Sequence, residues 1–142
     1  MKLADIKVAI NDLIKSEFPS IEIQSTDVEK GFKRPTFFVQ LDTLSRDSGQ
    51  FVSNRSMVAR IYYFPSERYE YSIEAMDIQD RLESIINLNF RVLDRVITID
   101  ETRAQMIDGV LEFEFDFEFI DKSGAYRDDD GDLMEVLEIG DR

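Results

Sequence analysis

The stretch LEFEFDFEF, from Leu111 to Phe119, decides much of the fold. Every second residue is a large apolar side chain, and every residue between them carries a carboxylate. Because side chains alternate between the two faces of a β-strand, this stretch predicts a strand with one apolar and one acidic face. We expect the apolar face to lie against a core. The acidic face carries Glu112, Glu114, Asp116 and Glu118.

A tight turn joins this strand to the segment before it. Asp108-Gly109 is a composition typical of two-residue hairpin turns, because both residues tolerate positive φ. A preceding strand is expected near Phe90–Leu93 or over Val96–Arg103.

A second hairpin is predicted in the first half of the chain. Apolar and polar residues alternate over Thr36–Asp42 and again over about Arg55–Phe64. The polar segment Leu44–Ser53 between them predicts a hairpin loop longer than a tight turn. A short strand over Ile21–Gln24 precedes this hairpin.

Two amphipathic helices complete the pattern. Apolar residues recur at helical spacing from Leu3 to Ile14, and Phe18-Pro19 ends this helix because the residue before a proline avoids the α region. Ser66, after Pro65, is the expected N-cap of a second helix that extends to about residue 87. The apolar stripe of the second helix comprises Tyr71, Ala75, Ile78, Leu82, Ile85 and Ile86.

The order of these elements predicts an α+β fold. It favours a largely antiparallel β-sheet with two amphipathic helices packed on one face, a two-layer sandwich. Residues 1–122 are expected to form this single domain. The segment 123–142 is acidic, and we expect it to be mobile or to dock on a partner.

The composition excludes several classes of function. The chain of 142 residues has no Cys and no His, which removes thiol and imidazole catalysis and the usual zinc sites. The formal net charge is −13, so general binding to nucleic acid or to an anionic membrane is not expected. The N-terminus lacks a signal-type apolar region and no 18 apolar residues run together, which predicts a soluble protein without a targeting signal.

The acidic motifs predict neither a metal site nor a catalytic centre, and no cofactor is expected. Aligning the run DDDGD with a calcium-binding loop puts Tyr126 and Leu137 where Asp and Glu are required, so a solvated turn is favoured. The carboxylates of the acidic strand share one environment, whereas acid–base catalysis needs carboxyl groups with different pKa values. We expect a solvated outer face partly neutralised by Arg60 or Arg103, or a face that repels another polyanion.

A few cations stand out against this acidic background. Lys30, Lys33 and Arg34 cluster at a predicted turn, and Arg46 lies in the predicted hairpin loop. The cluster is either a solvated turn or a docking point for the acidic surface of a neighbouring copy or partner. A basic point and an acidic face on one molecule suit head-to-tail association, and such contacts close into rings.

The order of motifs resembles a known family. An amphipathic helix is followed by GFKRPTFFV (31–39), by a strand ending in IYYFPS (61–66), by a second helix and by DGVLEFEFDFEF (108–119). This arrangement resembles the tail terminator, or tail completion, proteins of long-tailed bacteriophages and prophages, in the branch common in Gram-positive hosts. The resemblance spans about Leu3 to Ile120 and leaves out the acidic C-terminal segment.

The resemblance implies a structural virion protein and not an enzyme. Members form a ring, typically hexameric, at the head-proximal end of the tail tube, where they end tube polymerisation and join the tail to the head. The expected partners are other copies of the chain, the tail tube protein and the head-tail connector protein. The expected location is the virion tail, after synthesis in the bacterial host cytoplasm, with no membrane contact.

The resemblance also suggests roles for the charged residues. If the acidic face borders the channel of the ring, it repels DNA phosphates, and the genome passes through without specific binding. The predicted channel-facing residues are Glu112, Glu114, Asp116 and Glu118. The predicted subunit-interface residues are Lys30, Lys33, Arg34, Arg46, Leu133, Val136 and Leu137.

A second class of function fits the same charge. A small acidic inhibitor that mimics DNA would use the regular carboxylate row as a copy of a phosphate track and bind a basic nuclease or defence protein. It predicts a monomer or dimer whose binding falls steeply with salt.

Overall fold

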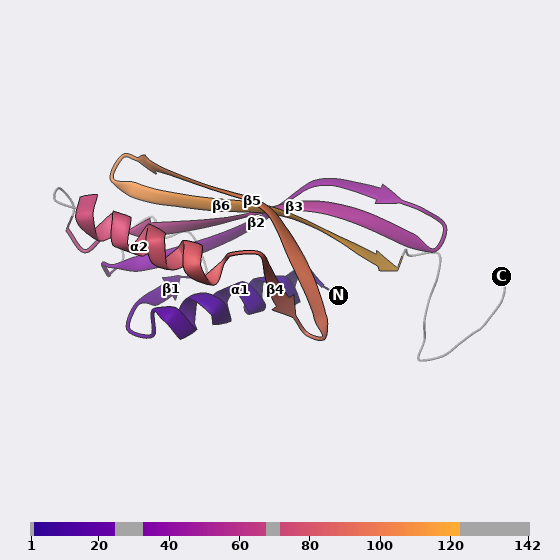
Figure 1. The fold of residues 1–142 in the computed structure, drawn as a ribbon, viewed down its shortest axis with the longest axis horizontal. Helices are drawn as coiled ribbons and strands as arrows, with labels where there is room; N and C mark the ends of the chain where they lie inside the picture. The colour runs from indigo at the N-terminus through magenta and orange to yellow at the C-terminus, as the bar shows by residue number, and fades with distance from the viewer. Residues whose placement is uncertain (1, 25–32, 68–71, 123–142) are drawn as a thin grey trace.

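The computed structural model describes residues 2–24, 33–67 and 72–122 (Figure 1). Two helices and six strands lie within these ranges, so the chain belongs to the predicted α+β class. In chain order they are α1 (Leu3–Glu17), β1 (Glu22–Gln24), β2 (Thr36–Ser48), β3 (Val52–Phe64), α2 (Ser72–Ile85), β4 (Asn89–Val92), β5 (Arg95–Ile107) and β6 (Val110–Lys122).

The strands form one sheet in the order β1-β2-β3-β6-β5-β4. β1 pairs with β2 in parallel, and the other neighbouring strands pair antiparallel. The sheet is therefore mixed, with one parallel pair at an edge that the sequence did not predict. Alternation identifies a strand, but it does not tell in which direction the strand runs beside its neighbour.

The core lies between the apolar face of the sheet and the two helices. α1 buries Ile6, Ile10 and Ile14 completely, at the helical spacing that was predicted, and α2 buries Ile78 and Leu82. These side chains join one apolar cluster with the alternate residues of β3 and β6. The buried residues of β3 and β6 in this cluster are Met57, Ala59, Ile61, Tyr63, Leu111, Phe113, Phe115, Phe117 and Phe119.

The sheet curls at the side of β4. β4 and the first part of β5 bend away from the rest of the sheet, and β4 lies beside α1 (Figure 1). Phe90 of β4 then packs edge-on against Phe115 and Phe117 of β6, with ring centroids 5.8 and 5.3 Å apart. Because of this curl, the expected arrangement of two layers is not confirmed.

The predicted hairpin loop Leu44–Ser53 is wrong. β2 continues to Ser48 and β3 begins at Val52, so only residues 49–51 form the turn. The two strands stay paired to their ends, with a bulge between Thr43 and Ser45. The segment has no apolar alternation because most of it lies beyond the core, and the pattern therefore resembles a loop.

Two other predicted boundaries have different outcomes. The turn at Asp108-Gly109 is confirmed, with positive φ values of 52° and 78° at its two residues. The N-cap at Ser66 is wrong, because α2 begins at Ser72. The backbone N–H and the hydroxyl of Ser66 instead donate hydrogen bonds to Glu74, which also accepts one from the Tyr63 hydroxyl.

Candidate functional site

The predicted carboxylate row lies in the middle of the sheet, on the face opposite the core. β6 is flanked by β3 and β5, so its acidic side chains have strands on both sides. The side chains of Glu112 and Glu114 are only 13% and 18% exposed, whereas Glu118 towards the end of β6 is exposed. The row is therefore not a uniform wall of solvated carboxylates, and the neighbours of each carboxylate decide its charge environment.

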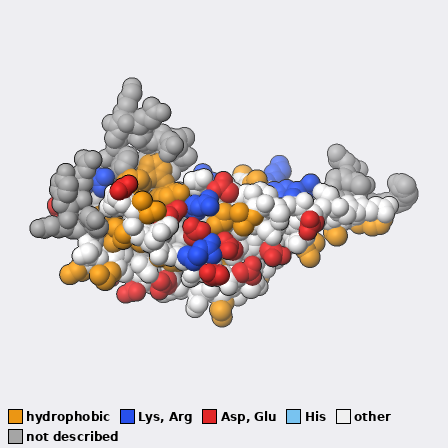
Figure 2. Space-filling view, turned by 90° about the horizontal axis from the view of Figure 1, so that it is seen from above, with side chains coloured by type: hydrophobic (Ala, Val, Ile, Leu, Met, Phe, Trp, Pro, Cys, Tyr) orange, Lys and Arg blue, Asp and Glu red, His pale blue; other side chains and the backbone are white. Residues whose placement is uncertain are grey.

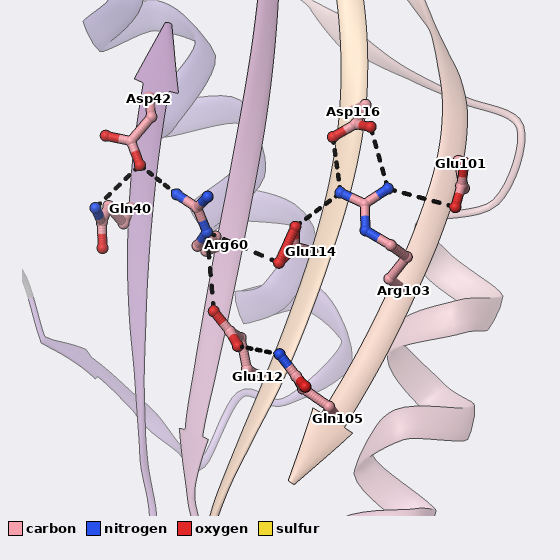
Figure 3. A network of polar contacts seen from close by, with 9 residues as sticks. All are labelled: Gln40, Asp42, Arg60, Glu101, Arg103, Gln105, Glu112, Glu114 and Asp116. Atoms are coloured by element: carbon pink, nitrogen blue, oxygen red, sulfur yellow. Dashed lines mark hydrogen bonds and ion pairs between the residues drawn. The ribbon is translucent and has the colours of Figure 1, made fainter. Parts of the chain in front are cut away.

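Arg60 of β3 holds one side of this row (Figure 3). It lies directly opposite Glu114 in the β3–β6 register, and its Nε is 3.8 Å from a carboxylate oxygen of each of Glu112 and Glu114. Its Nη1 donates a hydrogen bond to Asp42 of β2. Arg60 thus links carboxylates from two strands, and it is the pairing that was predicted from sequence.

Arg103 of β5 holds the other side of the row (Figure 3). Its Nη2 lies 2.7 Å from Glu114 and 3.0 Å from Asp116, and its Nη1 lies 3.4 Å from Glu101. The hydrogen bonds to Asp116 and Glu114 raise the pKa of the Arg103 guanidinium, so it stays charged. Glu114 is therefore shared between two arginines.

Negative charge remains in excess on this face after the internal pairing. The network of Figure 3 contains five carboxylates and two guanidinium groups. Figure 2 shows the same face, with the two cationic groups surrounded by acidic side chains. Such a surface repels a polyanion at short range, and its two arginines keep the carboxylate row compatible with a folded sheet.

The predicted interface cations have different surroundings. Lys33 is exposed, as a docking point requires. Arg34 is partly buried: it donates a hydrogen bond of 3.1 Å to the carbonyl of Pro65, and its guanidinium lies 5.6 Å from the centre of the Phe64 ring. Arg34 therefore holds the start of β2 to the end of β3. The predicted residues Lys30, Leu133, Val136 and Leu137 lie outside the described residues.

Arg46 lies on a projecting part of the sheet that we name the arm (Figure 1). The arm consists of residues 45–48 of β2, 52–56 of β3 and 118–122 of β6, together with the turn 49–51. β5 pairs with β6 only as far as Ile99 and Phe117, so the arm extends about 16 Å beyond that pair. Arg46 is exposed there, and the cross-strand neighbour Arg55 was not among the predicted interface residues.

Sequence reasoning also missed the outward stripe of α2. The sequence predicts the buried stripe of this helix. The exposed stripe consists of residues one or two positions after those of the buried stripe, so it repeats at the same helical spacing. They are Ile73, Met76, Asp77, Asp80 and Glu83. The signal was present in the sequence, since Ile73 and Met76 are too apolar for a purely solvated helix face.

The described residues contain neither a cluster of metal-ligating side chains nor a membrane-spanning helix. Within 2–24, 33–67 and 72–122, no group of three or more Asp and Glu side chains is placed to hold a metal ion. In the same ranges, neither helix is long and apolar enough to cross a membrane.

A protein-family model described as phage tail terminator protein matches residues 5–130, which is most of the chain. The chain belongs to the phage tail terminator family. The match includes α1 except for its first two residues, and it covers α2, the whole sheet and the carboxylate row. It extends eight residues past Lys122. The predicted family is confirmed, and the Gram-positive branch stays a prediction. A search of curated proteins finds no match.

Membership of the tail terminator family shows the general role of the chain. The chain is a structural component of a phage tail and interacts with other tail components.

Proposed function

We propose that this tail terminator protein forms a ring, typically of six copies, at the head-proximal end of the tail tube. The ring ends tube polymerisation and joins the tail to the head connector. The shape of the molecule supports this proposal: the arm lies at one end of its long axis and α2 at the other (Figure 1). An elongated molecule with different surfaces at its two ends suits head-to-tail contacts, which close into a ring when the rotation per copy permits.

The acidic face of the sheet borders the channel of the proposed ring. The observation that carries this proposal is the excess of carboxylates over arginines in the network around β6. DNA phosphates passing such a face are repelled at distances of about 10 Å or less at moderate salt. The genome then slides through without binding.

The ring role is tested by deleting the gene from the encoding phage or prophage. Negative-stain electron microscopy of the particles should show overlong tubes, or finished tails that are not attached to filled heads. Normal infectious virions would overturn the proposal and leave the DNA-mimic inhibitor as the function to test next, with a pull-down of basic host proteins at low and high salt.

The channel role needs variants that do not break the fold. Lysine at all four carboxylate positions of β6 would place six cations on one small face, because Arg60 and Arg103 are already there. Neutral replacements are therefore better. The channel variant is Glu112→Gln, Glu114→Gln, Asp116→Asn and Glu118→Gln. It should assemble and eject DNA more slowly, since Arg60 and Arg103 are then balanced only by Asp42 and Glu101 and the face no longer repels phosphates.

The matched control removes the same number of charges from exposed positions on other surfaces. The control variant is Asp12→Asn, Glu67→Gln, Asp94→Asn and Asp108→Asn. DNA ejection should stay at the wild-type rate in this control. Equal ejection rates in the two variants would contradict the channel role and leave the row as ordinary solvated surface.

We also propose that residues 123–142 contact a neighbouring copy or the tail tube. The segment combines acidic residues with Leu133, Val136 and Leu137, which suit docking more than solvation. A chain that ends after Lys122 keeps every strand and helix described above, so it should fold and assemble poorly. Wild-type assembly of this shortened chain would remove the role.

A further inference from the structure

The arm carries an arginine pair whose charge is not balanced within the described chain. Arg46 of β2 and Arg55 of β3 are direct cross-strand partners, and Phe119 of β6 is the next residue in the same row. Like charges directly opposite each other destabilise a strand pair. Among the side chains that the structure describes, which do not include those of Asp121 and Lys122, no carboxylate lies within 4.0 Å of either guanidinium.

A third arginine, Arg95, lies near Phe119. The guanidinium groups of Arg55 and Arg95 each lie 5.9 Å from the centre of its ring. Arg95 also donates a hydrogen bond to the carbonyl of Ile120. Arg55 and Arg95 beside this ring, together with Arg46 opposite Arg55, place three arginines close together in a protein of net charge −13.

The tip of the arm adds apolar surface to this cationic face. Phe51 and Val52 are 56% and 53% exposed. Val52 at the tip precedes Arg55 by three positions, which is ~10 Å along a strand. A partner surface that fits the arm therefore needs an apolar contact and, about 10 Å away, a cluster of negative charge.

The outward stripe of α2 has this composition. Ile73 and Met76 near its start are 81% and 61% exposed, and Asp80 and Glu83 follow on the same side of the helix. Asp80 follows Ile73 by seven positions, which span ~10 Å along a helix. Adjacent exposed apolar residues that are bordered by polar residues are typical of a contact site.

We propose that the arm of one copy docks on the outward stripe of α2 of the next copy. Arg46 and Arg55 meet Asp80 and Glu83, and the apolar tip covers Ile73 and Met76. The inference rests on the proposed ring, and it names the two surfaces that join neighbouring copies. Since the arm and α2 lie at opposite ends of the molecule, the contact is head-to-tail and does not use the acidic face of the sheet (Figure 1).

A crosslinking experiment tests this contact directly, because the natural chain has no Cys. The test variant carries Arg46→Cys and Glu83→Cys in the full chain. It is treated with a short bismaleimide, both as concentrated purified protein and in lysates of cells that produce particles. A ladder of covalent dimers, trimers and larger species is expected, since each copy offers one thiol at each end.

The matched control keeps Arg46→Cys and moves the second thiol to Asp94→Cys, an exposed acidic position in the turn between β4 and β5. No ladder is expected there. The proposal is overturned if the test variant gives no ladder, if the control gives an equal ladder, or if Arg46→Cys crosslinks only to a different protein. The gene deletion tests the tail role separately. If the purified protein gives a ladder but the deletion mutant makes normal virions, the contact between copies is supported and the role in the tail is contradicted.

Charge reversal supplies a second readout that does not depend on the crosslinker. Arg46→Glu with Arg55→Glu, or Asp80→Arg with Glu83→Arg, should each lower the association constant about tenfold or more. The chain with all four changes should regain association. Failure of this fourfold variant to recover, while circular dichroism shows a native fold, would contradict the pairing.

Discussion

The core and the arm are built from the same three strands, but different forces hold them. In the core, β3 and β6 place their apolar residues against α1 and α2, and Phe113 and Phe117 are completely buried. In the arm, the same strands continue mostly with polar or exposed residues, apart from the buried Phe119, and neither α1 nor α2 covers the face that carries Arg46 and Arg55. Backbone pairing therefore continues where the hydrophobic effect no longer supports it.

We therefore expect the arm to contribute little to the stability of the fold. A two- or three-stranded ribbon without a covered face has little stability of its own, and two opposed arginines lower it further. Such a segment is well placed to contact a partner, since binding supplies the apolar and electrostatic contacts that the isolated molecule lacks. Changes in the core should lower the free energy of unfolding, and changes in the arm should alter assembly.

The largest effect is expected in the core. Phe117→Ala removes a ring that packs against Phe90 and Phe115, and it should lower the free energy of unfolding by about 3–5 kcal/mol. The control Arg46→Ala in the arm should change it by less than about 0.5 kcal/mol. Urea unfolding followed by circular dichroism measures both, and similar values for the two would break the distinction between core and arm.

An intermediate effect is expected where β3 meets α2. Burial raises the pKa of the Glu74 carboxyl, but hydrogen bonds from Tyr63 and Ser66 outweigh it, so its pKa lies below the ordinary value of 4.5. The ionised carboxyl thus stabilises the fold above pH 4.5, and this contribution is lost as the pH falls through the lower folded pKa.

Glu74→Gln should therefore cost about 1 kcal/mol at neutral pH and much less in acid. Urea unfolding at a series of pH values from 7 downwards measures the difference between variant and wild type. A difference that stays constant over the whole series would show that the hydrogen bonds do not depend on the charge of Glu74.

A smaller effect is expected on the acidic face. Arg103→Met leaves Glu114 and Asp116 with less compensating charge and should cost about 0.5–1 kcal/mol, because the arginine is 40% exposed and solvent screens its ion pairs. The cost should shrink at 1 M salt, where repulsion between carboxylates is screened. A cost that is independent of salt would point to lost packing of the arginine stem instead.

The smallest effect on global stability is expected at the tip of the arm. A Cβ at Gly49 would lie 2.9 Å from the carbonyl oxygen of Val52, so Gly49→Ala must distort the turn. We expect the free energy of unfolding to change by less than about 0.5 kcal/mol, because the arm opens without disturbing the core. Hydrogen exchange should become faster in the arm alone, and faster exchange in α1 would show that the two regions are coupled.

Much of the core was predictable because its signals are local. The spacing of Ile6, Ile10 and Ile14 identifies α1, and the alternation in β6 identifies both of its faces. The pairing of Arg60 and Arg103 with the carboxylate row also followed from cross-strand logic. The inferences on α1, β6 and Arg103 need only neighbouring residues or one hairpin, whereas the Arg60 pairing joins two strands that are distant in the chain.

The errors share a physical cause. The polar ends of β2 and β3 resemble a loop because alternation reports burial, and a strand without a core beneath it leaves no such signal. The surroundings of Arg34 depend on Phe64 and Pro65, which are about thirty residues away in the chain. The parallel pairing of β1 with β2 depends on the path of the chain between the two strands. The pattern of residues within either strand does not specify that path.

The strands and helices of the core, the two faces of β6 and the strong negative charge follow from side-chain periodicity and composition, so they can be predicted from the amino-acid sequence. The common direction of Arg46 and Arg55 across two strands, and the position of the arm and α2 at opposite ends, are visible only in the folded molecule. Register, curl and the direction of a strand arise from contacts between distant segments. The surfaces proposed to join one copy to the next therefore appear only in the folded molecule.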